Sequence, residues 1–343
     1  MLAAARVTLK LHRFEVGVSA LAAIAAAVVG VSIALRMDAV GISQACLDRV
    51  QALQDGSLAG EACFSLVQAG SRILGESFLD GEGTVPLSIM GALPFLLGVL
   101  GGVPIVAREL EARTAPTAWS LNGSRLRWLA RQVTPVGLVL GVAMGLAALA
   151  AMPVADDWVR WGHGGASWLI GLHGPLAVVR AFGAFGIGLA VGALLGRTLP
   201  AFIFAVALML AIQFALGQAR QTWLATMEPQ PIATISEETG EYNPIPGAVA
   251  IGWGWWTPDG QLIGAEEARR IATEAGVPPA DPGDVQDTPA STWLAEHGYL
   301  GVSLGVTDEM ALGWAPFDGI TFGLVGLIGL GGAAVLVNRR RPG

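Results

Sequence analysis

The sequence predicts an all-α polytopic membrane protein with six transmembrane helices. Of its 343 residues, 53% are hydrophobic and only 14% are charged, whereas soluble globular chains usually carry about 25% charged residues. The apolar residues also come in runs of about 20, the length that spans the hydrocarbon core of a bilayer. This pattern excludes a soluble enzyme with one ordinary core. A net charge of −7, with no basic stripe outside the membrane flanks, excludes a nucleic-acid-binding protein.

Six apolar runs, bounded by charges or prolines, are long enough to cross the membrane. We expect the helices at 16–36, 86–107, 133–153, 175–195, 199–217 and 317–337. The first run is not expected to be a cleaved signal peptide, because Met37-Asp38 after it is not a small-residue cleavage site. The chain then divides into an amphipathic N-terminus (1–15), helices one to five (16–217) with an outer loop (37–85) and a charged inner loop (108–132), an outer segment (218–316), and helix six with a basic tail (317–343).

The distribution of arginine and lysine predicts the orientation. With the N-terminus inside, the short cytoplasmic pieces hold 12 of the 20 basic residues, whereas 23 of the 27 acids fall in the outer loops. An excess of basic residues in short loops marks the cytoplasmic side. Both termini are therefore expected in the cytoplasm. Because arginine greatly outnumbers lysine and Ala and Gly are abundant, the composition favours a GC-rich bacterium and hence a bacterial plasma membrane.

The outer segments are expected to form solvated surface rather than a binding or metal site. Cys46 and Cys63 in loop 37–85 face an oxidising compartment on this topology, so a disulfide is permitted, with two buried free thiols as the alternative. Segment 218–316 is strongly acidic, which favours a solvated surface, and we expect it to be helical or irregular with one amphipathic helix at 265–275. Its cluster Gly252-Trp253-Gly254-Trp255-Trp256 favours interfacial anchoring, with a lipid-facing entrance as the alternative.

No catalytic constellation is present in the sequence. Lys10 is the only lysine and no glycine precedes it closely, so the chain cannot supply a P-loop and is not expected to be an enzyme. ATP and Mg²⁺ would have to be bound by another subunit, and no cofactor or metal is expected in this chain. His163 and His173 lack acidic residues at ligand spacing.

The spans themselves are nearly free of ionisable groups, which disfavours an ion-coupled carrier. Arg180 and Asp318 lie near the outer ends of their helices, and we expect both to reach the outer interface. Small residues at helical spacing indicate close helix packing. They are Gly188, Gly192 and Gly196 in the fourth span, with a similar stripe of Gly323, Gly326 and Gly329 in the sixth.

The inner loop 108–132 is the most informative part of the sequence. It predicts a helix continuing from the second span, a break at Pro116, and a basic return whose arginines reach the inner headgroups. Trp119 and Trp128 are expected to lie in the same headgroup layer. Glu109 and Glu111 are unexpected on a basic face. A short polar helix there could dock into a cleft on a cytoplasmic partner.

The run from Gly102 to Thr114, followed by Ala118-Trp119-Ser120 and Ser124-Arg125, resembles the Arg-Glu…Gly-Thr…Trp-Ser…Ser-Arg motif of ABC-2-type (type V) exporter permeases, including bacterial multidrug and lipid exporters. Arg113 stands where glycine is common in that family. The resemblance implies an N-terminal amphipathic helix, a separate cytoplasmic ABC ATPase and a second permease copy. It also implies an ATPase-coupling role for five residues of this loop, namely Arg108, Glu109, Glu111, Thr114 and Trp119.

These features predict the permease subunit of an ATP-driven exporter that moves a hydrophobic or amphipathic compound. The alternative is a membrane-anchored sensor or envelope-assembly protein whose outer segment binds a ligand. That alternative shares the acidic outer segment but needs no inner docking helix. A neighbouring gene for a P-loop ATPase would favour the exporter, and a neighbouring kinase gene the sensor.

Overall fold

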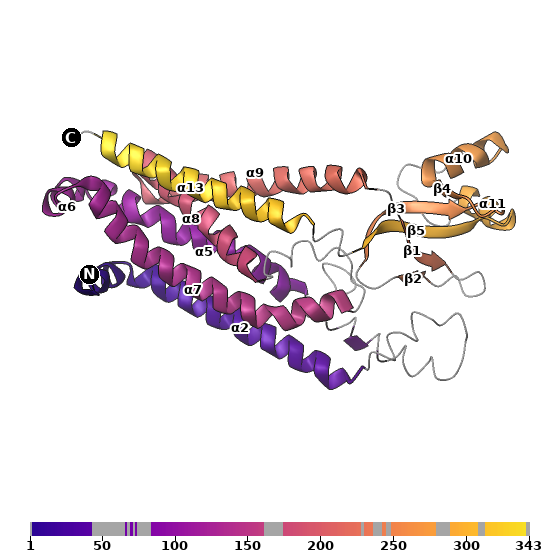
Figure 1. Ribbon diagram of the computed structural model, residues 1–343, viewed down its shortest axis with the longest axis horizontal. Helices are drawn as coiled ribbons and strands as arrows, with labels where there is room; N and C mark the ends of the chain where they lie inside the picture. Colours follow the sequence, from indigo (N-terminus) through magenta and orange to yellow (C-terminus); the bar gives the residue numbers. More distant parts are fainter. Residues whose placement is uncertain are drawn as a thin grey trace.

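A computed structural model describes residues 2–42, 66, 69–70, 73, 84–160, 174–227, 230–235, 242–244, 248–278, 289–307 and 313–340. The molecule is elongated, with a helical bundle at one end and a small sheet at the other (Figure 1). Both chain termini lie at the bundle end that is remote from the sheet.

Six helices in the described residues are long and apolar enough to cross a membrane, as the sequence predicts. They are α2 (Arg13–Val40), α5 (Thr84–Glu111), α7 (Arg125–Arg160), α8 (Pro175–Leu195), α9 (Thr198–Ala225) and α13 (Ala315–Arg339). A short helix α1 (Leu2–Leu11) precedes α2 and packs against α7, and α6 (Ala115–Leu121) connects α5 to α7. The all-α membrane architecture is confirmed.

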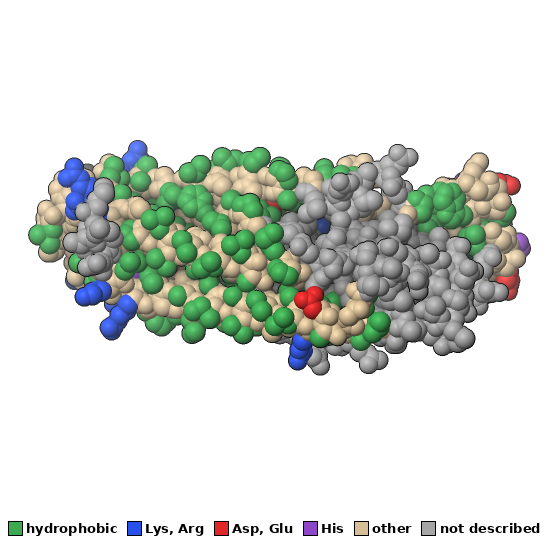
Figure 2. All heavy atoms as spheres, turned by 60° about the horizontal axis from the view of Figure 1, so that its bottom comes forward, with side chains coloured by type: hydrophobic (Ala, Val, Ile, Leu, Met, Phe, Trp, Pro, Cys, Tyr) green, Lys and Arg blue, Asp and Glu red, His purple; other side chains and the backbone are tan. Residues whose placement is uncertain are grey.

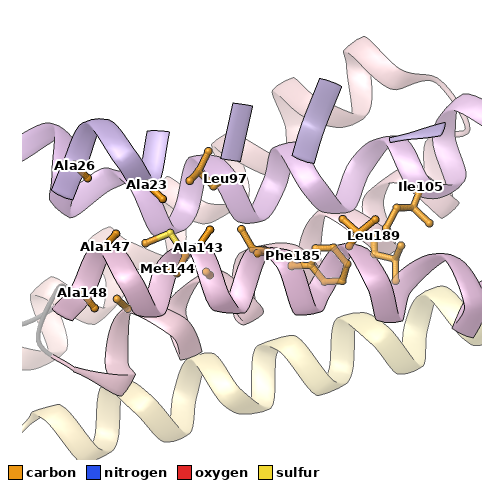
Figure 3. Packing of buried hydrophobic residues seen from close by; sticks show 14 of the residues in the cluster. Ala23, Ala26, Leu97, Ile105, Ala143, Met144, Ala147, Ala148, Phe185 and Leu189 are labelled. Atoms are coloured by element: carbon orange, nitrogen blue, oxygen red, sulfur yellow. The ribbon is translucent and has the colours of Figure 1, made fainter. Parts of the chain in front are cut away.

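The core of the bundle is built around α8, which packs most extensively on α5 and α13. Phe185 and Leu189 of α8 meet Leu97 and Ile105 of α5, and small residues of α2 and α7 continue the same cluster (Figure 3). Glycines permit this close packing because helix backbones approach most closely where side chains are smallest. A Cβ atom on Gly30 of α2, for example, would lie 2.7 Å from the carbonyl oxygen of Ala150 in α7.

The segment between α9 and α13 corrects the expectation of a helical or irregular outer region. Its described residues form a five-stranded antiparallel sheet in the order β2-β1-β5-β3-β4. The strands are β1 (Gln230–Ile235), β2 (Tyr242–Pro244), β3 (Ala248–Trp256), β4 (Leu262–Gly264) and β5 (Leu300–Thr307), accompanied by the helices α10 (Ala265–Glu274) and α11 (Pro289–Glu296).

The strands escaped the sequence analysis because their partners are distant along the chain. The central pair joins β3 to β5, with Ala248 opposite Thr307 and Trp256 opposite Leu300. The tryptophan cluster expected at the membrane interface is part of β3. Its tryptophans alternate with glycines at the period of two of a strand, but this alternation covers only a few residues and the sequence analysis did not use it. Gly254 is required there, since a Cβ atom would lie 2.8 Å from the backbone carbonyl oxygen of Ile263 in the neighbouring strand β4. The expected helix at 265–275 is present as α10.

Candidate functional site

The candidate site is the polar connection between α5 and α7, at the end of the bundle that holds both termini (Figure 1). Helix α5 ends at Glu111, α6 occupies Ala115–Leu121 and α7 begins at Arg125. Figure 2 shows lysine and arginine side chains gathered at this end, whereas apolar side chains cover the length of the bundle. The connection is therefore outside the apolar zone and accessible to a partner.

The turn after α5 is held by Glu109 and Thr114. The Thr114 hydroxyl donates to the Glu109 carboxylate, and the Thr114 amide donates to the Glu109 carbonyl at 3.0 Å. Between them Arg113 adopts φ = +56°, the left-handed region that favours glycine. This conformation explains why glycine suits this position in the sequences that the loop resembles. Glu109 and Thr114 thus fix the angle at which α6 leaves α5.

Glu111 connects the site to the next helix hairpin. Its Oε2 accepts a hydrogen bond of 2.9 Å from the backbone amide of Thr198, the first residue of α9. The first amides of a helix have no partner inside the helix, and the helix dipole favours a negative charge beside them. Glu111 therefore caps α9 from a different part of the chain.

Trp119 and Trp128 are buried inside the protein, so their rings pack on protein rather than on lipid, and their depth at the inner face of the membrane stays a prediction. The two rings meet edge to face with centroids 6.2 Å apart, and the Arg125 guanidinium lies 4.8 Å from the Trp119 ring centroid. Aromatic pairs favour this geometry and a cation over the ring adds to it. Trp119 consequently anchors α6 on the start of α7.

Arg125 ties the site to the last helix. Its Nη1 donates to the carbonyl oxygen of Asn338 at 2.9 Å and to that of Arg340, which belong to the uncapped C-terminal end of α13. Arg340 in turn donates through Nη1 to the carbonyl oxygen of Ala193 near the end of α8, at 2.7 Å. The expectation that Arg125 extends to lipid headgroups is replaced by a bridge between three helices.

The remaining arginines at this end behave differently. Arg131 donates to Asn122 Oδ1 at 2.9 Å and so braces the turn after α6. Arg108 is exposed on α5 and lies within electrostatic range of Glu15, which is buried beside His12 at the start of α2. The Nδ1 of His12 and Oε2 of Glu15 are 3.9 Å apart.

The outward surface of α6 carries an apolar residue that the sequence analysis missed. Leu121 is 80% exposed, and its neighbours Pro116, Thr117 and Ser120 are also exposed. An isolated exposed leucine is normal on a protein surface. At the tip of a braced polar helix beyond the membrane-spanning part, it is instead a suitable contact for a partner.

A comparison with protein-family models matches residues 16–220, more than half of the chain, to the family described as ABC-2 membrane transporter related. The chain belongs to this family. No curated protein and no solved structure matches it. Membership of the ABC-2-related family makes the chain a multi-pass membrane permease and implies an ABC transporter system with an ATPase partner.

The five residues singled out for coupling all lie in one small region but differ in burial. Arg108, Glu111 and Thr114 are exposed, Glu109 is half-buried and Trp119 is buried. All of them except Arg108 make hydrogen bonds or ring contacts within the chain that are described above. The sequence located the segment but missed Leu121 and Arg340 and gave Arg125 a different role. The C-terminal carbonyls of α13, which need donors, were the signal that could have pointed to Arg125.

The other candidate residues lie elsewhere. A Cβ atom on Gly192 of α8 would lie 2.6 Å from the Val103 carbonyl oxygen of α5, and one on Gly188 would lie 3.1 Å from that of Val99. Gly196 is outside this contact and ends α8 with φ = +64°, beside the Arg340 side chain. Cys46 and Cys63 fall outside the described residues, so their disulfide stays a prediction.

Proposed function

We propose that this chain is the permease subunit of an ATP-driven exporter in a bacterial plasma membrane, with both termini in the cytoplasm. A separate ABC ATPase binds and hydrolyses ATP with Mg²⁺, and this chain supplies the membrane path. The observation that carries the proposal is a set of hydrogen bonds at the two ends of the α5–α7 connection that contains α6. Glu111 binds the start of α9, and Arg125 binds the end of α13, which Arg340 joins to α8.

These bonds give the segment a way to transmit force. When the ATPase displaces α6, the turn at Glu109 and Thr114 passes the movement to α5, and Glu111 passes it to the first residue of α9. Arg125 passes it to the end of α13, which Arg340 connects to α8. Rigid elements joined by hydrogen bonds are one physical means of coupling distant sites, and these bonds provide such a path.

The exposed faces of the bundle suit a hydrophobic or amphipathic cargo. Helix α9 is the least buried of the spanning helices, and most of its outward side chains are apolar. We propose that two copies pair and that the compound moves along their interface. In a membrane such an apolar helix face contacts lipid tails unless a second copy or a lipid-soluble compound covers it.

The decisive experiment is purification of the full chain in mild detergent from its native membrane, with identification of stoichiometric partners. We expect a P-loop ATPase whose ATP turnover depends on this chain. Leu121→Asp should lower the amount of co-purified ATPase by about tenfold, the effect of losing about 1.4 kcal/mol of contact energy. Leu121→Met keeps the apolar contact and should bind as the unmodified chain does.

A second variant tests the connections rather than the contact surface. Glu111→Gln removes the charge that caps α9, so we expect normal ATPase binding but reduced export. Failure to find any ATPase, under conditions that hold known membrane complexes together, would contradict the proposal and favour a sensor or envelope-assembly protein. Equal binding by Leu121→Asp and Leu121→Met would contradict the docking role of α6.

A further inference from the structure

Buried polar side chains form a stripe along α1 and the first turns of α2. They follow one another at helical spacing, which puts them on one side of the two helices. These residues are Thr8, His12, Glu15 and Ser19, with exposed fractions of 4%, 6%, 5% and 5%. Gly30, further along the buried side of α2, contacts α7, and both α1 and α2 pack on α7. The polar stripe therefore faces α7 at the end of the bundle that holds both termini (Figure 1).

His12 is the joint between α1 and α2. Its amide donates to the carbonyl oxygen of Thr8, and its own carbonyl oxygen accepts from the amide of Val16, both at 3.0 Å. The Thr8 hydroxyl donates to the carbonyl oxygen of Arg131 in α7 at 3.4 Å. A direct attachment of α1 to α7 thus lies one helical turn before His12.

His12 and Glu15 face each other without a hydrogen bond. The His12 Nδ1 and the Glu15 Oε2 are 3.9 Å apart, and both atoms are buried without a hydrogen-bond partner among the described residues. A buried carboxylate is costly unless a positive charge and hydrogen bonds compensate it. An imidazole that carries a proton on both nitrogens has a positive charge and a donor at Nδ1, so it supplies both within a small movement of the side chain.

The other charged groups around this pair are exposed or already paired. The exposed basic side chains on α1, α5, α7 and the start of α2 are Lys10, Arg13, Arg108, Arg127 and Arg131. Of these, Arg108 lies within electrostatic range of Glu15. The groups with partners described above are Glu109, Glu111 and Arg125. Because water screens exposed charges, the charge of His12 acts most directly on Glu15.

We propose that protonation of His12 fastens α1 and the start of α2 to α7, and that loss of this proton loosens them. The proton offsets the buried charge of Glu15 and therefore stabilises the attached arrangement. Attachment is then strongest at low pH and weakens as the pH rises through the range in which an imidazole titrates. This device belongs to the chain itself and does not rest on the proposed export function.

The test is hydrogen–deuterium exchange of the full chain in lipid nanodiscs at about pH 5.5 and about pH 8, on either side of the imidazole titration. Each exchange rate is compared with the intrinsic amide rate at the same pH, which gives a protection factor for local opening. We expect the amides of α1 and the first turn of α2 to be protected about tenfold more at the lower pH, the effect of one charge-assisted hydrogen bond. The amides of α13 should be protected equally at both pH values.

Three variants separate titration from packing. His12→Gln keeps a polar side chain that cannot titrate, so protection of α1 should be the same at both pH values. Ser19→Ala is the matched control, because it removes another buried polar group of the stripe and should keep the tenfold difference. Glu15→Gln keeps the inference falsifiable if the loss of His12 disturbs folding, since it removes the charge that the proton offsets and should also abolish the difference.

The proposal is overturned if the unmodified chain protects α1 equally at both pH values, or more strongly at the higher one. It is also overturned if His12→Gln or Glu15→Gln retains the difference. A parallel change in α13 would overturn it too, because the pH would then act on the whole bundle rather than on this joint.

Discussion

At the scale of single residues, the buried pair of Arg180 and Asp318 determines how α8 meets α13. Both side chains are almost fully buried, and two hydrogen bonds join them. Removing a charge from water is expensive, and only the attraction and the hydrogen bonds of the partner offset that cost. Any arrangement of α8 and α13 that separates the two charges is therefore higher in free energy.

Replacing one member of this pair should destabilise the protein strongly. Asp318→Leu leaves the Arg180 charge buried without its acceptor, at a cost of about 3–5 kcal/mol. The double variant Arg180→Met with Asp318→Leu removes both charges and should recover most of that stability, because apolar pairs of similar volume replace buried ion pairs well. Thermal unfolding in detergent, followed by tryptophan fluorescence, measures both effects.

The control for this experiment is Arg269→Gln, which removes an exposed arginine from α10 and should not change the unfolding temperature. A double variant as unstable as the single one would contradict the account, since it would show that the two side chains act independently.

The sequence identified these two charged residues but not their relation. They are 138 residues apart, and nothing in the sequence between them indicates that α8 and α13 are neighbours. The bridge from Arg125 to the end of α13 spans 213 residues and was missed for the same reason. Polar residues in apolar runs can be found from the sequence alone, whereas their partners depend on how the helices pack.

At the scale of elements, the contacts of α8 are set by glycines on two of its faces. Gly188 and Gly192 face α5, whereas Gly183 and Gly186 face α13. A Cβ atom on Gly186 would lie 2.8 Å from the Gly326 Cα and closer still to its carbonyl oxygen. Neither helix can move aside without losing contact along its length.

A methyl group at this crossing should therefore separate the helices. We expect Gly186→Ala to destabilise the bundle by about 1–3 kcal/mol, the usual cost of overpacking. In the same detergent unfolding assay, Gly331→Ala on α13 provides the matched control, because a Cβ atom there meets nothing within 4 Å. It should be neutral or slightly stabilising, since alanine favours a helix over glycine by up to about 1 kcal/mol. Similar losses for both variants would contradict a role for close backbone contact.

The elements could be predicted where one run of sequence contains the whole signal. Each of the six spanning helices is a run of about 20 mostly apolar residues, so composition and length were sufficient to predict it. The sheet has no signal of that length. Its central strands β3 and β5 are separated by β4, α10 and α11. A bulge between Ala250 and Gly252 interrupts the alternation of β3, and one between Pro231 and Ala233 interrupts that of β1.

At the scale of the whole molecule, the charge distribution runs along the long axis. Lysine and arginine side chains gather at the end that holds both termini and α6, and acidic side chains appear at the opposite end, which holds the sheet with α10 and α11 (Figure 2). In a membrane this asymmetry has one favoured orientation, because short basic segments stay in the cytoplasm. We therefore expect α6 to face the cytoplasm and the sheet to face outward.

Labelling with a membrane-impermeant maleimide tests this orientation directly. In a background where Cys46 and Cys63 are serine, Asp259→Cys places a thiol in the exposed turn before β4, and Ser120→Cys places one on the exposed face of α6. Intact cells should label position 259 fully and position 120 only after permeabilisation. The reverse pattern would place α6 outside, where no cytoplasmic ATPase could reach it, and would contradict both the orientation and the docking role of that helix.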